Sequence, residues 1–220
     1  MTAVPDGEFL LPLFPLPNLV FFPQTRLPLH VFEPRYRHLI ADVTARDQRF
    51  GIVLLRPGFE SDYHDAPPIY EVGTMARIEQ TVALDDGRYN ILVQGETRFR
   101  IIDEVSREPY RTARVIAQPQ SEGDPSAAYA QRMWLTELSQ QYLRYLPEQG
   151  PVPEIATVAL EALTNALIMS LSLDTEEKQR LLEVDDIVTR AEEVGDELQH
   201  RIESLQFLEP FRQGGDPSRN

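Results

Sequence analysis

Cysteine is absent from the 220 residues, and lysine occurs once, as Lys178. Without cysteine the chain has no disulfide, no thiolate nucleophile and no cysteine-ligated zinc or iron–sulfur site. The single lysine stands in Glu177-Lys178-Gln179, in a predicted acidic helix, so neither a phosphate-binding P-loop nor a Ser–Lys protease dyad is expected. Gly-x-Ser-x-Gly and dinucleotide-type glycine motifs are also missing. The sequence therefore predicts a protein that is not an enzyme, with no cofactor and no metal site.

Positive charge is scarce. Lys+Arg number 21 against 35 Asp+Glu, for a net charge of −14, which argues against nucleic acid or an anionic membrane as the main partner. No apolar run reaches the roughly 18 residues that a bilayer-spanning helix needs. The apolar stretch Phe9–Phe22 has no basic residue before it and is broken by Pro12, Pro15 and Pro17, so it makes a poor secretory signal. A cytoplasmic protein is expected.

The charge is unevenly distributed along the chain. Residues 1–118 contain 13 Lys+Arg and 16 Asp+Glu, whereas the remainder contains 8 and 19. The junction after residue 118 is rich in Pro, Gly, Gln and Ser, which is typical of a loop. We expect a β-rich domain over 1–118, a helical subdomain over 119–210 and a flexible tail over 211–220.

The first part is predicted to be mostly strand, with one helix inserted from Pro34 to about Arg46. The clearest hairpin turns at Asp85-Asp86-Gly87-Arg88, because Asp-Gly supplies the positive φ values of a tight turn. Many short strands with one helix indicate an α+β protein built on a small, partly closed barrel. The expected strands are Glu8–Phe14, Leu19–Phe22, Leu27–Phe32, Phe50–Arg56, Tyr70–Leu84, Tyr89–Gln94, Thr97–Val105 and Tyr110–Ala117.

The second part is predicted to be helical. Asp124 is expected to cap the first helix, with Pro125 at its first position. Asp174 and Glu177 have the spacing of a capping box for a short third helix. The last helix has an apolar stripe from Val184 to Leu205. The expected helices are about Asp124–Leu146, Glu154–Leu171, Asp174–Leu182 and Val184–Leu205.

Four blocks in the first part occur in a characteristic order. They are the proline-rich Leu11–Tyr36, then Glu71–Ile78, Gly95–Ile101 and Pro109–Val115. This pattern resembles the N-terminal, substrate-binding domain of the Lon family of ATP-dependent proteases. The resemblance implies a PUA-like pseudo-barrel followed by a helical bundle, with unfolded or damaged polypeptides as partners and a role in protein quality control. Full family members continue into ATPase and protease modules, so we expect a binding module without either, with an AAA+ protease as a candidate partner.

Candidate polypeptide-binding residues come from two places. In the family, a strand–helix junction that matches Glu33-Pro34-Arg35-Tyr36 lies on a surface implicated in substrate recognition. The alternative is a plain helix start with Tyr36 packed and Arg35 solvated. Phe59 and Tyr63 lie in the loop that follows Arg56, where aromatic side chains suit capture of an apolar peptide or simply pack on the barrel.

Two further interpretations stay open. Arg98 and Arg100 fall on one face of a strand, with other arginines on neighbouring strands, which suits an RNA-binding PUA-like module. The apolar stripe of the last helix could pair with a second copy, in an oligomerising scaffold, or pack within its own bundle.

Overall fold

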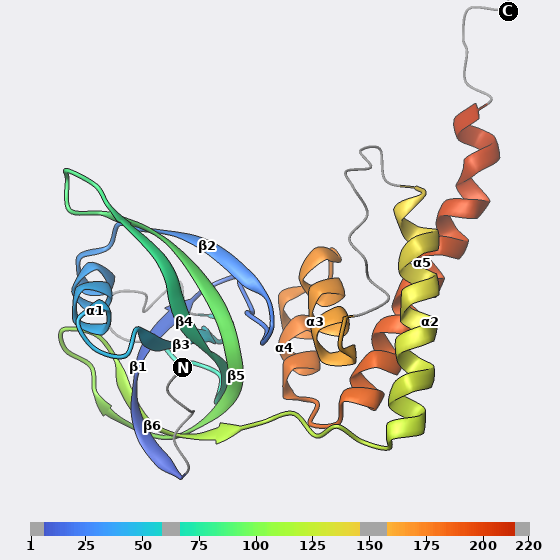
Figure 1. Ribbon diagram of the computed structural model, residues 1–220. Helices are drawn as coiled ribbons and strands as arrows, with labels where there is room; N and C mark the ends of the chain where they lie inside the picture. Colours follow the sequence, from blue (N-terminus) through green and yellow to red (C-terminus); the bar gives the residue numbers. More distant parts are fainter. Residues whose placement is uncertain (1–6, 59–66, 146–157, 214–220) are drawn as a thin grey trace, which may run out of the picture.

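A β-barrel and a group of helices lie side by side in the computed structural model, which describes residues 7–58, 67–145 and 158–213 (Figure 1). The predicted α+β class is confirmed. The strands are β1 (Glu8–Leu16), β2 (Arg26–Val31), β3 (Arg49–Leu54), β4 (Val72–Ala83), β5 (Tyr89–Ser106) and β6 (Thr112–Gln118). The helices are α1 (Pro34–Thr44), α2 (Pro125–Leu143), α3 (Leu160–Ser170), α4 (Thr175–Glu183) and α5 (Ile187–Gln213).

The sheet closes on itself. Its order is β2-β5-β4-β3-β1-β6, and a further pairing of β5 with β6 closes the strands from β5 to β6 into a barrel, with β2 added along β5. β1 and β3 are parallel, with β2 and α1 between them in the chain, and the other pairs are antiparallel. The long β5 has two partners on one edge, with β2 along Tyr89–Gln94 and β6 along Arg98–Ser106. The pseudo-barrel that the resemblance implies is therefore present.

The ring of Phe99 fills one part of the barrel interior. A Cβ on Gly51 would lie 2.6 Å from the Phe99 ring, and a Cβ on Gly73 would lie 2.8 Å from it. Both glycines therefore provide the space that the ring occupies. This explains why small residues interrupt β3 and β4 at these points.

The turn between β4 and β5 is the hairpin that the sequence predicts. Gly87 has φ +78°, the left-handed conformation that a side chain disfavours. Leu84 accepts a hydrogen bond from Gly87 and donates one to Arg88, which closes the turn. One expectation nearby is wrong, because the predicted strands Tyr89–Gln94 and Thr97–Val105 form the single strand β5, which passes irregular pairings without breaking.

Helix α1 covers one side of the barrel. Pro34 occupies its first turn, as predicted, and the helix buries Tyr36, Leu39, Ile40 and Val43. Figure 1 shows α1 on the side of the barrel that lies away from the other helices. Its apolar face packs with barrel residues such as Phe14, Phe50 and Ile78 in one cluster.

The remaining helices follow the sequence pattern with three corrections. The Asp124 carboxylate caps α2 by accepting from the Ala127 N–H at 2.8 Å, as expected. α3 begins at Leu160, not at Glu154, since Ala159 is extended; residues 146–157 lie outside the described part. Asp174 precedes α4 without a side-chain cap, and the carboxylate of Glu177 binds Arg180 instead of completing a capping box. α5 begins at Ile187, so Val184, the first residue of the predicted stripe, precedes the helix. The stripe is buried in the bundle from Ile187 to Ile202.

Barrel and helices share one hydrophobic cluster. Phe22 and Val72 of the barrel part pack in it with Leu135 of α2 and Leu198 of α5. The segment predicted as a strand at Leu19–Phe22 is not one; Phe21 enters the barrel cluster while Phe22 enters this shared cluster. A division into separate domains after residue 118, with a tail from 211, stays a prediction. Among the described helices, none is both long and apolar enough to cross a membrane.

Candidate functional site

The junction of β2 and α1 holds four of the predicted site residues. Glu33 and Arg35 form an ion pair at 2.9 Å, with both side chains mostly buried. Arg35 also lies over the ring of Tyr36, at 4.7 Å from its centroid. Pro34 is exposed and opens the helix. The junction therefore presents a polar pair fixed in place, not a mobile loop.

Tyr36 belongs to the barrel core. Its ring packs on Phe14 at 4.1 Å between centroids, and its hydroxyl donates to the Pro15 carbonyl at 3.3 Å. Because Tyr36 is buried, its part in the junction is to support Arg35, which lies over its ring. For Tyr36 the helix-start interpretation is therefore the one that fits its burial. Phe59 and Tyr63 lie outside the described residues.

Exposed apolar side chains adjoin this junction. Phe32 is 59% exposed directly after β2, and its ring stacks on His30 with 6.2 Å between centroids. His30 pairs across the sheet with Asn90, and Asn90 pairs with Val82, which is 56% exposed. Cross-strand partners point to the same face, so these side chains share the outer face of the sheet. We call His30, Phe32, Glu33, Arg35 and Val82 the β2–α1 surface.

Polar contacts fix the imidazole of His30 within this surface. Its Nδ1 lies 2.7 Å from the Asn90 side-chain oxygen, and its Nε2 lies 3.3 Å from a guanidinium nitrogen of Arg88. A ring with its proton on Nδ1 satisfies both contacts, as donor to Asn90 and acceptor from Arg88. Arg88 is held in turn by Asp86, and this pairing lowers the pKa of Asp86. The ring next to Phe32 is therefore held in one orientation.

The sequence pattern gave no direct sign of Phe32, His30 and Val82 as surface-forming residues. Leu27–Phe32 alternates like any half-buried strand, and which face is covered depends on α1 and on the partner strands. A usable signal was the Asp-Gly hairpin, because it fixes the pairing of Val82 with Asn90. The sequence alone does not indicate which face of β2 points outward, because this depends on its pairing with β5.

Arg98 is not part of a basic outer face, contrary to the expectation. It is 1% exposed and points from β5 toward the helices. One guanidinium nitrogen donates to the carbonyls of Leu182 and Val184 at 3.0 and 3.1 Å, and the other donates to Asp185 at 3.1 Å. Burial lowers the pKa of Arg98, an effect that Asp185 opposes. The α4–α5 junction therefore occupies the atoms that an RNA phosphate would need.

The other arginines of this proposed face are occupied too. Arg100 pairs with Glu71 at 3.3 Å and is half exposed. Arg111 binds Glu104 through two nitrogens, at 2.6 and 2.8 Å. The remaining pairs are Arg88–Asp86, Arg107–Glu104 and Arg114–Asp103. An interleaved set of ion pairs gives no net positive surface, so the geometry does not favour the RNA-binding interpretation.

Three buried polar side chains, Arg98, Asn165 and Arg190, lie between the barrel and the helices, and we call them the seam. Arg190 belongs to α5. It donates to Asn165 at 3.1 Å and to the carbonyls of Leu182 and Val184. Burial, with Arg98 nearby, lowers the pKa of Arg190 to about 10. Asn165 donates to the Pro23 carbonyl at 3.0 Å, and so ties α3 to the barrel. The seam therefore links α3, α4 and α5 to the barrel part. Figure 1 shows α3 and α4 on the side of the helices that lies nearer the barrel.

Glu161 of α3 lies near the same two arginines. Burial raises the pKa of its carboxyl group, while Arg190 and Arg98 act in the opposite direction. Across the described residues, no three His, Asp or Glu side chains are grouped so that they could hold a metal ion. The terminal guanidinium nitrogens of Arg98 and Arg190 bind side chains and backbone carbonyls, whereas the Nε atoms of both arginines are buried without a hydrogen-bond partner among the described residues. These contacts within the protein indicate a structural role.

Known proteins share this architecture. The profile of the substrate-binding domain of ATP-dependent protease La (LON) matches residues 10–200. The chain belongs to this family. Lon protease 2 of Myxococcus xanthus is 33% identical over 209 residues, and Lon protease of Anaeromyxobacter dehalogenans is 32% identical over 209 residues. These alignments cover 92% of the chain but 25% and 24% of the two relatives, so the chain spans about a quarter of their length.

Solved structures agree with this assignment. A Lon N-terminal domain protein from Xanthomonas campestris superposes with a TM-score of 0.61 at 25% identity, over 84% of this chain and 96% of that one. The N-terminal domain of Lon protease from the Mycobacterium avium complex gives a TM-score of 0.66 at 18% identity, over 87% and 98% of the two chains. The second likeness concerns the fold. The predicted resemblance to the Lon substrate-binding domain is therefore confirmed by the family match, and the two structures confirm the fold.

Proposed function

We propose that this protein captures unfolded or damaged polypeptides through exposed apolar segments and does so without making or breaking covalent bonds. The observation that carries the proposal is the β2–α1 surface, where Phe32 is exposed next to the Glu33–Arg35 pair and Val82 is exposed two strands away from His30. Membership of a substrate-binding family supports it.

The physical basis is the rigidity of this surface. Val82 stands on a paired strand, Phe32 directly follows one and stacks on His30, and the neighbouring polar side chains hold one another, so little conformational freedom is left to lose when a partner binds. Folded proteins keep most large apolar side chains inside, whereas unfolded chains offer them. Contact with the surface therefore selects unfolded chains, and we expect affinities of about 1–100 μM.

A role in protein quality control follows from this selectivity. A holdase or adaptor in the cytoplasm would keep an aggregation-prone chain dispersed and release it to an AAA+ protease. The relatives in the family comparisons are Lon proteases, which supports such a partner. Phe59 and Tyr63 extend the proposed binding residues into the loop after Arg56.

Aggregation measured by light scattering tests the proposal. A thermolabile test protein is heated with increasing amounts of this protein, and the scattering is followed with time. We expect the scattering to fall in proportion to the added protein, with no nucleotide required. Scattering that is unchanged at a several-fold molar excess would overturn the proposal, provided that circular dichroism shows this protein still folded at that temperature.

A further inference from the structure

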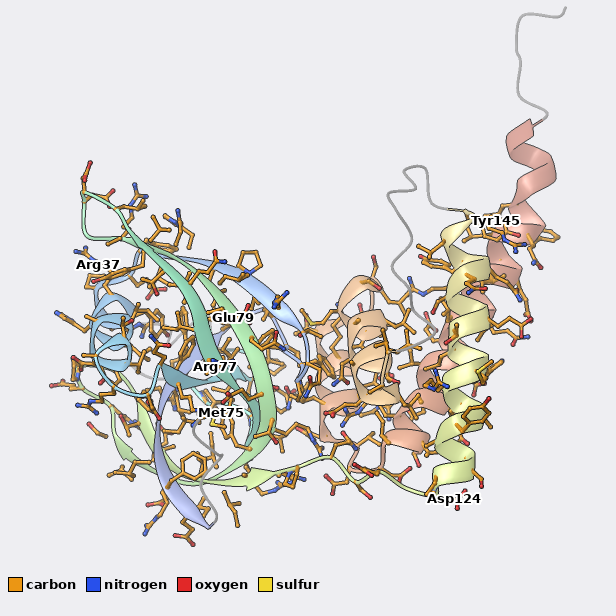
Figure 2. The ribbon with its side chains drawn as sticks, viewed as in Figure 1. Arg37, Met75, Arg77, Glu79, Asp124 and Tyr145 are labelled. Atoms are coloured by element: carbon orange, nitrogen blue, oxygen red, sulfur yellow. The ribbon has the colours of Figure 1, made fainter. Side chains whose placement is uncertain are left out.

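A pocket at one end of the barrel lies apart from the β2–α1 surface. Its volume is about 210 Å³, more than the roughly 150 Å³ of a cavity known to hold benzene, so it has room for one large apolar side chain. Leu11, Val43 and Met75, all almost fully buried, contribute its apolar lining. Figure 2 shows Met75 on β4 in the barrel wall, with Arg77 and Glu79 following it along the strand.

One wall of the pocket is an incompletely paired strand. The Leu13 N–H donates to the Arg111 carbonyl beside β6. Backbone groups alternate in direction along a strand, so the N–H of Leu10 points away from β6, toward the pocket. In the described part of the chain, β1 pairs with β3 only from Leu13 to Leu16, since Pro12 has no N–H to extend the ladder. Leu10 therefore offers a main-chain donor beside an apolar pocket.

The charges around the pocket have a positive excess. Arg46 lies at the rim and, within the described residues, makes no ion pair with an acidic side chain. Arg49 also lines the pocket, and it shares the Glu96 carboxylate with Arg77, at 2.6 and 3.0 Å. Asp47 is the other acidic side chain here. Of the residues that line the pocket, Arg46 and Arg49 are basic and Asp47 alone is acidic, in a protein with a net charge of −14.

We propose that this pocket takes a large apolar side chain of an extended polypeptide segment that has an acidic residue next to it. The apolar side chain enters the pocket, a carbonyl of the segment accepts from the Leu10 N–H, and the acidic side chain meets Arg46. An extended chain fits because strand addition supplies backbone hydrogen bonds while a pocket selects the side chain. This inference rests on the proposed function and names the class of segment that is bound.

Charge reversal at Arg46 tests the inference. Two short, unstructured, fluorescently labelled peptides carry one Phe, flanked by Asp in the first and by Lys in the second, and their affinities are measured at low ionic strength. We expect the intact protein to prefer the Asp peptide by roughly five-fold, and Arg46→Glu to reverse this preference. Arg37→Glu, at a position on the same helix that does not line the pocket, is the matched control and should keep the preference.

A backbone variant tests the strand contact independently. Leu10→Pro removes the N–H that faces the pocket, and Leu10→Ala keeps it. We expect the Asp peptide to bind at least about five-fold more weakly to Leu10→Pro than to Leu10→Ala. If Leu10→Pro fails to fold, the Arg46→Glu result decides alone.

The outcomes separate this inference from the proposed function. If the intact protein does not suppress aggregation of an unfolded protein, the proposed function fails. If it does so but shows no preference between the two peptides, or Arg46→Glu leaves the preference unchanged, the pocket inference is wrong and the proposed function stands. A third outcome would also overturn the pocket inference. In this outcome the protein forms a dimer, the Asp peptide competes with dimer formation, and Arg46→Glu abolishes the dimer.

Discussion

Arg98 of the barrel and Arg190 of the last helix donate to the same two main-chain carbonyls, those of Leu182 and Val184. These carbonyls stand at the C-terminal end of α4, where a helix leaves acceptors without partners and has a partial negative charge. Two buried guanidinium groups at one helix end repel each other, yet each satisfies acceptors that water cannot reach. The seam therefore fixes the orientation of the helices to the barrel.

Removing Arg98 should destabilise the protein. Arg98→Ala leaves buried carbonyls with fewer donors and opens space between the two parts, so we expect a loss of about 3 kcal/mol in the free energy of unfolding. Arg100→Ala, two residues along the same strand, breaks a half-exposed ion pair and should cost no more than about 0.5 kcal/mol. Urea denaturation measures both. Equal losses in the free energy of unfolding for the two variants would contradict a stabilising role of the seam.

Gly195 of α5 should tolerate no larger residue. A Cβ at this position would lie 2.0 Å from the ring of Trp134 on α2, so Gly195→Ala forces the two helices apart. We expect a loss of about 1–3 kcal/mol and a shift in the fluorescence of Trp134, the single tryptophan. Asp196→Ala, at the exposed neighbouring position, is the control. Unchanged fluorescence in Gly195→Ala would argue against this packing.

Tyr110 should make stability depend on pH in the alkaline range. Burial and a 2.7 Å hydrogen bond to Asp42 raise its pKa from 10.0 to about 12. The folded state therefore keeps this proton where the unfolded state loses it, and the stabilisation, complete below pH 10, is lost between pH 10 and 12. In urea denaturation, the difference in the free energy of unfolding between the intact protein and Tyr110→Phe should become smaller in this pH range. Tyr129→Phe, at an exposed ring, should give a constant difference, and a constant difference for Tyr110→Phe would refute the assignment.

Phe32 should contribute to polypeptide binding and little to folding. Its ring is exposed, so Phe32→Ser should change the free energy of unfolding by less than about 0.5 kcal/mol. Loss of an apolar anchor should weaken binding of an unfolded protein by about ten-fold. Tyr129→Ser removes a similarly exposed ring from α2, away from the β2–α1 surface, and should bind as the intact protein does. Equal weakening in both variants would mean that the surface has been assigned to the wrong place.

Local signals in the sequence predicted the parts of the fold that depend on nearby residues. The Asp-Gly turn at Gly87, the α1 face around Leu39 and the Asp124 cap each follow from a few neighbouring residues. The structure confirms all three. For Tyr36 the sequence is compatible with both a binding role and a packed one, because its helical spacing fits the core while its place at a helix start suits a surface.

Long-range contacts decided the features that the sequence could not show. An arginine in a strand is normally an outward-facing residue, and nothing near Arg98 indicates that a helix end 84 residues further on accepts its hydrogen bonds. The sequence around Phe21 and Phe22 is typical of a strand, yet the two rings pack in two different hydrophobic clusters. The β2–α1 surface likewise depends on pairings between strands far apart in the sequence.

Fluorescence titration tests the central claim most directly. One test protein, labelled with a fluorophore, is titrated with this protein in two forms, reduced and unfolded or native and folded. The account predicts saturable binding of the unfolded form with a dissociation constant of about 1–100 μM, and no binding of the native form over the same range. Absence of binding to the unfolded form, or equal binding of both forms, would contradict it.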